Sequence, residues 1–288
     1  MKAIRLHHRG GPEAFVYEEA PQPHPGADGV LVRVHAAAVT PTELTWVPTW
    51  TTRTGEPRRF PIIPGHEFSG TIAAVGGGVK DLAVGDPVYG LNDWFDDGAQ
   101  AEYCVARAAG VARKPRSVDH VSAAATPISA LTAWQGLIVR SHLADGQRVL
   151  IHGAAGGVGV FAVQLARRRG AHVIGTASAN NVAFVRALGA DEVIDYRTRR
   201  FEDVVHGLDV VFDTVGGETL ERSWGILKPG GRLVTIATSG EGSQDPRVRE
   251  AFFIVEANGA QLGGIARLID GGQLRPVVDA IFPLPQAR

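Results

Sequence analysis

The first part of the chain alternates short apolar segments with turn residues. The segments expected to be extended are residues 1–8, Gly29–Ala36, Phe68–Val75, Asp86–Gly90 and Ala101–Val105. Closely spaced short strands separated by glycine and proline turns are typical of a β-barrel or a β-sandwich. Residues 1–120 are therefore predicted to form an all-β lobe.

From about residue 120, apolar strands alternate with helical segments. The expected strands are Arg148–His152, His172–Thr176, Asp191–Asp195, Asp209–Asp213 and Arg232–Ile236. The expected helices are Gly157–Arg169, Val182–Leu188 and Glu218–Leu227, the last ended by Pro229-Gly230-Gly231. Nearly continuous apolar strands that alternate with helices predict a parallel sheet covered on both faces. The fold class is α/β, with a doubly wound Rossmann sheet beside the β lobe.

Composition and charge exclude several classes of protein. The 288 residues are 44% apolar and 20% charged and carry a net charge of −1, which gives no long-range attraction to nucleic acid or an anionic membrane. The N-terminal segment lacks the apolar core of a signal peptide, and no apolar run is long enough to span a bilayer. Cys104, the single cysteine, cannot form an internal disulfide or a thiolate metal cluster. We expect a soluble, cytoplasmic protein of two lobes.

A glycine-rich loop, Gly153–Gly159, stands between the first strand and the first helix of the α/β part. A dinucleotide pyrophosphate meets backbone N–H groups at this position of a Rossmann unit. Gly156 is expected to let the backbone approach the phosphate, and Gly159 to let the helix pack against the strand. A purely structural turn is the alternative, but the strand–helix–strand context favours dinucleotide binding. The predicted cofactor-binding residues of the loop are Ala154, Ala155, Gly156, Gly157, Val158 and Gly159.

The end of the second α/β strand distinguishes NADP from NAD. An NAD site places an acidic residue there, which accepts a hydrogen bond from the ribose 2′-hydroxyl. In this chain the first acid after the strand His172–Thr176 is Asp191. Its polar side chains can donate to a 2′-phosphate instead, so NADP(H) is the predicted cofactor. The residues assigned to this part of the cofactor site are Thr176, Ser178, Asn180 and Tyr196, with Arg197 as a further source of positive charge.

Several motifs taken together resemble the medium-chain dehydrogenase/reductase superfamily, in its zinc-independent quinone oxidoreductase branch. They are Pro64-Gly65-His66-Glu67-Phe68-Ser69-Gly70, Val84-Gly85-Asp86-Pro87-Val88-Tyr89-Gly90, Leu131-Thr132-Ala133-Trp134, His152–Gly159, Leu188-Gly189-Ala190-Asp191 and Asp213-Thr214-Val215-Gly216-Gly217. The resemblance covers essentially the whole chain. It implies a GroES-like β-barrel catalytic lobe over residues 1–120, an NADP-binding Rossmann domain over 121–255, and a C-terminal return to the catalytic lobe over 256–288. The last helix and strand of the family are expected to be missing.

Zinc-dependent relatives share the Gly-His-Glu segment, but the other zinc ligands are absent here. A catalytic zinc needs three protein ligands, and the family's two cysteine positions correspond to Thr40 and Ile128. Isoleucine cannot bind a metal, so no metal site is predicted. We interpret His66 and Glu67 as hydrogen-bonded structural residues.

The resemblance also implies which residues surround the nicotinamide and the substrate. Thr132 matches a threonine that packs against the nicotinamide ring, although it can also be a helix-start hydroxyl. Thr40 and Glu43 replace an Asn and an Asp of many quinone oxidoreductases. Their hydroxyl and carboxyl groups can still orient the substrate or relay a proton, so both are candidate catalytic residues. Glu43 is either a general acid or a solvated loop carboxylate.

Four aromatic residues are candidates because they fall in irregular stretches of the first lobe, and the resemblance implies which residues lie near the nicotinamide. Loop aromatic residues can line a pocket for a flat acceptor or pack the lobe; they are Trp46, Trp50, Trp94 and Phe95. Residues expected near the nicotinamide end are Thr214, Val215, Ile236, Ala237, Phe252 and Phe253, with the loop Ile236–Gly240.

The predicted function is NADPH-dependent reduction of quinones or other conjugated carbonyls, such as enones and enals, by hydride transfer without zinc. Such acceptors need mainly orientation and a proton source from the protein. One alternative is a trans-2-enoyl thioester reductase. Another, of a different class, is a non-catalytic NADPH-binding protein. The family resemblance also suggests a homodimer.

Overall fold

The computed structural model describes residues 1–237, 240 and 242–288, which divide into two compact units. The first unit comprises residues 1–128, 257–271 and 276–288, and the second comprises 129–256 and 272–275. The first boundary thus falls after Ile128, rather than at residue 120. Thr238 and Ser239, part of the loop expected near the nicotinamide, lie outside the described residues.

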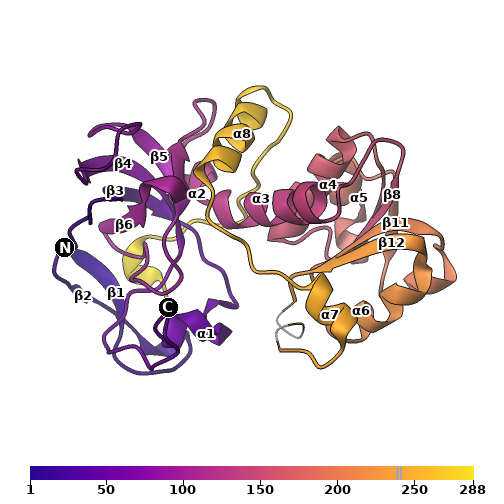
Figure 1. The fold of residues 1–288 in the computed structure, drawn as a ribbon, viewed down its shortest axis with the longest axis horizontal. Helices are drawn as coiled ribbons and strands as arrows, with labels where there is room; N and C mark the ends of the chain where they lie inside the picture. Colours follow the sequence, from indigo (N-terminus) through magenta and orange to yellow (C-terminus); the bar gives the residue numbers. More distant parts are fainter. Residues whose placement is uncertain (238–239, 241) are drawn as a thin grey trace. The chain divides into compact units, whose positions relative to one another are not determined.

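The first unit is built on antiparallel strands (Figure 1). They are β1 (Lys2–Leu6), β2 (Phe15–Glu19), β3 (Gly29–Ala37), β4 (Glu67–Val75), β5 (Pro87–Leu91), β6 (Tyr103–Arg107) and β7 (Val111–Arg113). Strands β1 and β2 form a hairpin, and the others form one sheet in the order β6-β3-β4-β5-β7. Alternate side chains of this sheet, among them Val32, Phe68 and Val88, are buried in one apolar cluster. The predicted strands are confirmed, and together they form a GroES-like half-barrel.

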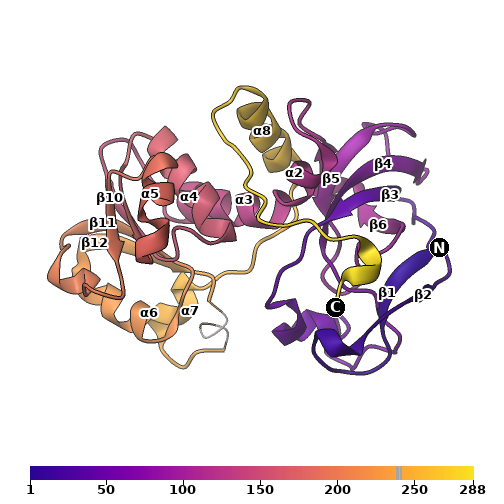
Figure 2. The same ribbon diagram turned by 180° about the vertical axis from the view of Figure 1, so that it is seen from behind.

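A helix from late in the sequence completes the first unit. Helix α8 (Gly259–Asp270) lies beside the half-barrel and α2 (His120–Ala124) (Figure 2). The buried Tyr89 hydroxyl donates to the carbonyl of Leu262 at 2.7 Å, and the Ser117 N–H donates to the Asp270 carboxylate at 2.9 Å. These long-range bonds hold α8 in the first unit.

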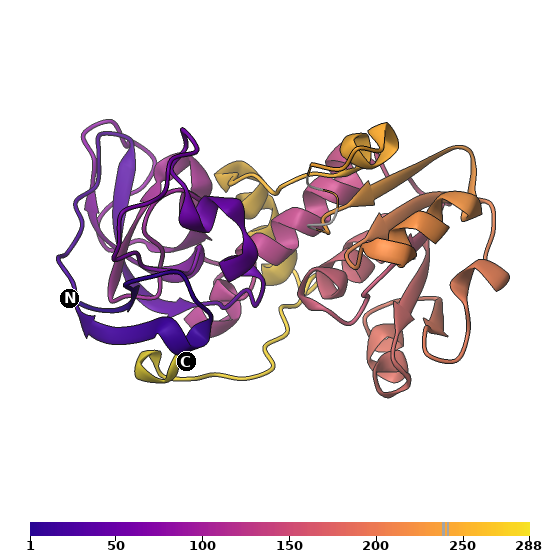
Figure 3. The ribbon, with the colours of Figure 1, turned by 90° about the horizontal axis from the view of Figure 1, so that it is seen from below.

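The C-terminal segment also packs on the first unit. It ends in a short 3₁₀ helix, Leu284–Gln286. Leu284 and Ala287 pack on the cluster around Ile4 and Leu6, and the Arg288 guanidinium donates to the carbonyl of Phe15 at 3.2 Å. Figure 3 shows this segment beside β1 and β2.

The second unit is a five-stranded parallel sheet in the order β10-β9-β8-β11-β12. Its strands are β8 (Arg148–Ile151), β9 (His172–Ala177), β10 (Glu192–Asp195), β11 (Leu208–Asp213) and β12 (Leu227–Thr235). Its α-helices are α4 (Gly157–Arg168), α5 (Val182–Ala187), α6 (Gly217–Ser223) and α7 (Pro246–Ala251). Helix α3 (Pro127–Trp134) begins in the first unit and continues into a π-helical turn, Gln135–Arg140. The predicted doubly wound Rossmann sheet is confirmed.

The two faces of the parallel sheet are covered by different helices. Side chains of α6 and α7, including Leu220 and Val248, share one buried cluster with Leu150 and Val211 of the strands. Helices α4 and α5 lie over the opposite face (Figure 1). Burial on both faces explains why these strands are apolar at nearly every position.

The expected helix Glu218–Leu227 was wrong at its C-terminal end. Helix α6 ends at Ser223, and after a 3₁₀ turn β12 begins at Leu227 and runs through the Pro229-Gly230-Gly231 segment. The pairing of β11 with β12 shifts between Leu208 and Val210, which accommodates the extra residues. Strand β12 is an edge strand, where proline and an irregular register are tolerated.

No helix in the described part of the chain is both long and apolar enough to cross a membrane.

Candidate cofactor and substrate site

The glycine-rich loop connects β8 to α4 in the second unit. Gly153 has a left-handed backbone (φ 66°), and a Cβ on it would clash with the Thr214 hydroxyl. A Cβ on Gly159 would overlap the carbonyl oxygen of Gly153, so the close packing expected of Gly159 is present. By contrast, a Cβ on Gly156 would approach the protein no closer than 3.3 Å. A side chain on Gly156 would therefore be tight against the Gly153 carbonyl oxygen, although far less so than one on Gly159.

Only some of the backbone N–H groups of the loop are available to bind a ligand. The Ala154 N–H donates to the carbonyl of Thr176 at 3.0 Å, and Ala154 is fully buried, so this residue supports the loop and does not face a ligand. Gly156 caps α4 without a side chain. The next N–H groups, of Gly157, Val158 and Gly159, stand in the first helical turn, where the helix supplies no acceptor. This end of α4 fits a pyrophosphate.

The strand beside the loop contributes Thr214 and Val215. The Thr214 hydroxyl donates to the carbonyl of His152 at 2.8 Å. Asp213 is fully buried, and its carboxylate accepts from the Val215 N–H at 3.0 Å and the Thr235 hydroxyl at 2.8 Å. Asp213 thus fixes the turn that places Thr214 and Val215 beside Gly153.

His152 is a residue of this region that the sequence analysis left without a role. Its ring nitrogens lie 3.2 Å from the Thr176 hydroxyl and 3.0 Å from the Ser223 hydroxyl. Burial lowers the pKa of His152 to about 4, because desolvation disfavours the charged imidazolium. Thr176 is itself buried and bonded to His152, so it stabilises the loop from the interior of the unit and does not face a ligand. The sequence signal that could have predicted this role is a histidine at the end of an apolar strand.

The residues assigned to the 2′-phosphate follow two neighbouring strands. Ala177 at the end of β9 pairs with Asp195 at the end of β10, so Ser178 and Tyr196 leave the same edge of the sheet. The side chain of Asn181 donates to the Ser178 hydroxyl at 3.3 Å. Tyr196 is 57% exposed, and the Arg197 guanidinium lies 5.8 Å from its ring centroid. Exposed Asn180 follows Ser178.

The residues expected at the nicotinamide end follow β12 and α7. The Ile236 N–H donates to the carbonyl of Asp213, and the Phe253 N–H to the carbonyl of Thr235, both at 3.2 Å. Phe253 is buried, with the Arg140 guanidinium 4.7 Å from its ring centroid. Its ring therefore packs within the unit, whereas Phe252 and Ala237 are partly exposed.

Thr132 lies within α3 and is almost fully buried. Because α3 begins at Pro127, Thr132 is an interior helix residue, and its interpretation as a helix-start hydroxyl was wrong.

In the first unit, Glu43 and His66 form a buried pair. Glu43 is 4% exposed and His66 is 2% exposed. The same carboxylate oxygen of Glu43 accepts from the Gly65 N–H at 2.7 Å and lies 2.9 Å from Nδ1 of His66. The interpretation of Glu43 as a solvated loop carboxylate was therefore wrong.

Glu67 points to a different partner. Its carboxylate accepts from the N–H of Ile128 at 2.9 Å. Burial raises the pKa of Glu67 to about 8, and the nearby Glu43 carboxylate adds to this effect. Thr40 is partly exposed, and its carbonyl accepts from the Glu43 N–H at 3.0 Å. Within the described residues, no three His, Cys, Asp or Glu side chains are placed to share a metal ion.

The four aromatic residues have different environments. Trp50 ends helix α1 (Val47–Trp50), is buried among Ile4, Leu6 and Ile62, and donates through its indole N–H to the carbonyl of Leu44. The expectation that Trp50 lines a pocket from an irregular segment was therefore wrong.

Two of the remaining aromatic residues, Trp46 and Trp94, lie near His66. The rings of Trp46 and Trp94 meet edge to face at 5.4 Å, and Trp94 lies 5.2 Å from the His66 ring. Phe95 stacks with Arg53 at 4.9 Å. Trp46 and Trp94 thus remain candidates for a substrate pocket.

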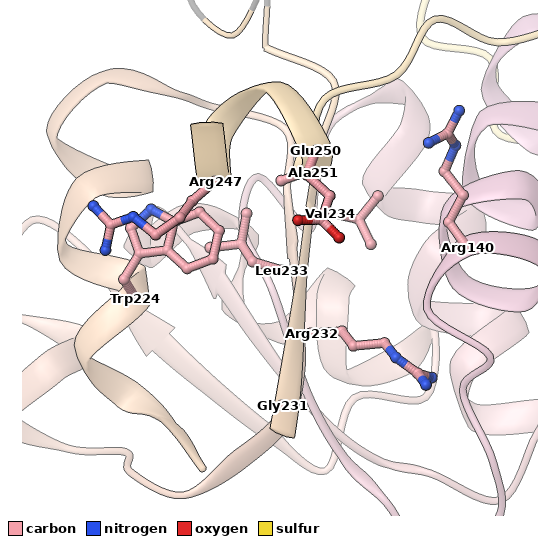
Figure 4. A pocket seen from close by; sticks show the side chains of 9 residues that line it. All are labelled: Arg140, Trp224, Gly231, Arg232, Leu233, Val234, Arg247, Glu250 and Ala251. Carbon is pink, nitrogen blue, oxygen red and sulfur yellow. The ribbon is translucent and has the colours of Figure 1, made fainter. Parts of the chain in front are cut away.

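A separate pocket of about 440 Å³ lies in the second unit along edge strand β12. Figure 4 shows Arg140 and Arg232 to one side of β12 and Arg247, stacked on Trp224, to the other. No residue predicted to bind the cofactor lines this pocket.

An antiparallel half-barrel and a doubly wound parallel sheet with a glycine-rich first loop define a two-domain dehydrogenase fold. Comparison with known proteins gives its family. Residues 26–116 match the alcohol dehydrogenase GroES-like domain, and residues 188–288 match a zinc-binding dehydrogenase family. The chain belongs to the medium-chain dehydrogenase/reductase superfamily, in its quinone and alkenal oxidoreductase branch.

Two curated relatives and one solved structure illustrate the match. An Arabidopsis thaliana chloroplastic NADPH-dependent alkenal/one oxidoreductase is 35% identical over 91% of this chain and 67% of the relative. A chloroplast envelope quinone oxidoreductase homolog of the same plant is 30% identical over 100% and 92%. The quinone oxidoreductase structure from Coxiella burnetii superposes with a TM-score of 0.90 at 30% identity, over 100% of this chain and 93% of that one.

Proposed function

We propose that this chain reduces conjugated acceptors, namely enones, alkenals and quinones, by hydride transfer from NADPH without a catalytic zinc. The observation that carries this proposal is the glycine-rich loop between β8 and α4, whose close packing needs Gly159 and whose first helical turn has N–H groups without an acceptor in the helix. The names of the relatives, an alkenal/one oxidoreductase and a quinone oxidoreductase homolog, support the class of acceptor.

The chain's own residues have distinct tasks in this reaction. When bound, NADPH supplies the hydride. The first-turn N–H groups of α4 bind its pyrophosphate, and Thr214 and Val215 are assigned to the ribose beyond it. We assign Thr132, Ile236, Ala237 and Phe252 to the nicotinamide end.

Zinc-free chemistry suits a conjugated acceptor. An alcohol dehydrogenase zinc stabilises an alkoxide as a Lewis acid. A conjugated acceptor instead spreads the charge left by hydride addition over its own π system. Thr40 and Ile128 replace two metal ligands, which supports the zinc-free proposal.

The edge formed by β9 and β10 supports NADPH over NADH. Ser178 and Asn180 can donate hydrogen bonds to a 2′-phosphate, and Arg197 beside Tyr196 supplies a positive charge. A carboxylate at this place would repel the phosphate.

A panel of acceptors, run with each reduced nicotinamide, tests the proposal. Oxidation of NADPH is measured with benzoquinone, a simple enone, an alkenal and a trans-enoyl thioester, with and without EDTA. We expect turnover of the first three, faster with NADPH than with NADH and insensitive to EDTA. Loss of activity in EDTA contradicts the zinc-free mechanism, and equal kcat/KM for NADH and NADPH contradicts the cofactor assignment.

The same panel distinguishes the two alternatives. A CurK enoyl reductase structure superposes with a TM-score of 0.84 at 25% identity, which favours a trans-2-enoyl thioester reductase as the second candidate. Turnover confined to the thioester supports that candidate. Tight NADPH binding without turnover of any acceptor supports a non-catalytic NADPH-binding protein.

We further propose that the chain forms a homodimer through β12. This strand is at the edge of the parallel sheet, and an edge strand leaves one row of backbone groups free to pair with another chain. Sedimentation velocity tests the proposal, and a monomer throughout the micromolar range contradicts it. The cytoplasmic location stays a prediction.

A further inference from the structure

The imidazole of His152 joins the glycine-rich loop of the second unit to helix α6. His152, Thr176 and Ser223 are all buried. Nδ1 of His152 lies 3.2 Å from the Thr176 hydroxyl oxygen, and Nε2 lies 3.0 Å from the Ser223 hydroxyl oxygen. Thr176 accepts from the Gly153 N–H at 3.3 Å through its hydroxyl and from the Ala154 N–H at 3.0 Å through its carbonyl. The start of the loop is therefore held by Thr176, and Thr176 is held by His152.

These hydrogen bonds assign the position of the hydrogen on the imidazole. The Ser223 hydroxyl donates to the carbonyl of Thr219 at 2.6 Å, and a carbonyl can only accept. The Ser223 oxygen must then accept from His152, so Nε2 carries the hydrogen. Because burial lowers the pKa of His152 to about 4, Nδ1 carries none at neutral pH and accepts from the Thr176 hydroxyl. One neutral tautomer therefore satisfies every group between Gly153 and Thr219.

The groups that face His152 act on its charge in opposite directions. Burial has the largest effect and disfavours the charged ring; the Asp213 and Glu202 carboxylates favour it, and the Arg222 guanidinium disfavours it. The ring of Phe201 packs on the imidazole edge to face at 4.6 Å. A hydrogen on Nδ1 would face the Thr176 hydroxyl, whose own hydrogen would then have no acceptor among the described residues. The neutral ring is thus the form that holds the loop.

His152 also contacts the turn that follows β11. Its backbone carbonyl accepts from the Thr214 hydroxyl at 2.8 Å. This turn leads into α6, which ends at Ser223, the partner of the His152 ring. In the proposed function, the loop binds the pyrophosphate and Thr214 contacts the ribose. Both parts of the cofactor site are therefore bonded, directly or through Thr176, to one buried residue.

We propose that His152 is a positioning residue for NADPH: its neutral ring, with the hydrogen on Nε2, keeps the glycine-rich loop in the conformation that binds the pyrophosphate. This inference rests on the proposed function, in which the first turn of α4 binds NADPH. The ring acts through Thr176 and does not touch the cofactor. A residue that only filled the core would change the melting temperature and leave the NADPH affinity of the folded protein unchanged.

Two substitutions separate the two bonds of the His152 ring. Asparagine places its carbonyl oxygen near the position of Nδ1 and can still accept from the Thr176 hydroxyl. Glutamine reaches toward the position of Nε2 and can donate to Ser223, but it leaves the Thr176 hydroxyl without an acceptor. We expect His152→Asn to bind NADPH within about 3-fold of the unaltered protein, and His152→Gln to bind it about 10-fold more weakly. NADPH fluorescence titration measures the affinity, and the melting temperature shows whether each variant is folded.

Ser223 has a matched control in the same unit. Its hydroxyl and the buried hydroxyl of Ser141 each donate to the carbonyl four residues earlier. Ser223→Ala and Ser141→Ala should therefore lower the melting temperature by similar amounts. Only Ser223→Ala should also weaken NADPH binding, by about 3-fold or more, because it removes the acceptor of the Nε2 hydrogen.

The tautomer is measured on the unaltered protein. Long-range proton–nitrogen NMR correlations of nitrogen-15 histidine should show a ring with a hydrogen on Nε2 and none on Nδ1, which is missing from the spectrum of His152→Asn. An ordinary histidine titrates near pH 6.5, but this ring should stay neutral from about pH 8 down to about pH 5. A hydrogen on Nδ1, or titration within this range, overturns the inference.

The binding data distinguish failure of the inference from failure of the proposed function. If the unaltered protein does not bind NADPH, the proposed function fails, and the inference fails with it. If the unaltered protein binds NADPH and folded His152→Gln binds it equally well, the inference alone fails. Equal losses in Ser223→Ala and Ser141→Ala likewise overturn it, because a general loss of stability would then explain both.

Discussion

The Glu67 carboxyl group is buried beside a second acid, and this placement has a consequence for stability. Its pKa of about 8 lies above its ordinary value of 4.5, so the folded chain keeps a proton that the unfolded chain releases. The stability that this proton contributes is complete below pH 4.5 and is lost as the pH rises toward 8.

Glu67→Gln should therefore gain stability relative to the unaltered protein as the pH rises. Glutamine cannot ionise, and its carbonyl can still accept from the Ile128 N–H. The difference in unfolding free energy should grow by up to about 1.4 kcal/mol per pH unit between about pH 5 and about pH 8. Urea unfolding at these two pH values measures it. A difference that does not vary with pH contradicts the raised pKa.

Gly159 allows a second prediction at the residue scale. A methyl group here would overlap the carbonyl oxygen of Gly153 and crowd Ala154. Gly159→Ala should weaken NADPH binding by about 10-fold or more, because α4 must move away from the loop. Gly225→Ala is the control, since a Cβ there meets nothing within 4 Å. NADPH fluorescence titration compares the two variants, and equal affinities would show that the loop tolerates the displacement.

The local sequence pattern predicts the environment of some of these residues, whereas tertiary contacts determine the environment of the others. The role of Gly159 could be predicted because strand, turn and helix are adjacent in the sequence. The burial of Glu43 and Trp50 could not, since the sequence around them has no regular apolar pattern and both are covered by residues far along the chain. Glu43 is bonded to Gly65 and His66, and Trp50 packs on β1.

At the scale of elements, we propose that the ends of β9 and β10 determine the choice of cofactor. Their parallel register carries Ser178 and Arg197 to one edge of the sheet. Arg197→Ala should lower kcat/KM for NADPH by about 10-fold, the loss of one charge-assisted contact to phosphate, and leave the value for NADH unchanged. Arg199→Ala, an exposed arginine two residues later, is the control. Equal losses with both nicotinamides would remove Arg197 from the 2′-phosphate site.

The strands of the parallel sheet could be predicted from sequence, but the start of β12 could not. Apolar runs reveal a strand that is buried on both faces. The Lys228–Gly231 stretch instead has the composition of a turn, and it is extended because β11 pairs beside it with a shifted register. Register depends on the neighbouring strand, which a local pattern does not contain.

At the scale of the whole molecule, the chain leaves the first unit after Ile128 and returns to it at Ala257. The return could not be located from the sequence pattern, because it depends on contacts such as the bond between Tyr89 and Leu262. Each unit has its own apolar cluster, so each can contribute its own unfolding transition.

NADPH binding and a substitution in the first unit should therefore shift different unfolding transitions. NADPH binds residues of the second unit in our proposal, so it should raise the temperature of one transition as its concentration increases. Tyr89→Phe removes the bond that holds α8 to the half-barrel and leaves the Leu262 carbonyl without that donor. It should destabilise the first unit by about 1–2 kcal/mol, lowering the transition that NADPH does not move. Differential scanning calorimetry with increasing NADPH measures both effects, and Tyr17→Phe, at a tyrosine 41% exposed, is the control. A single transition that responds to both NADPH and Tyr89→Phe would mean that the two units unfold together.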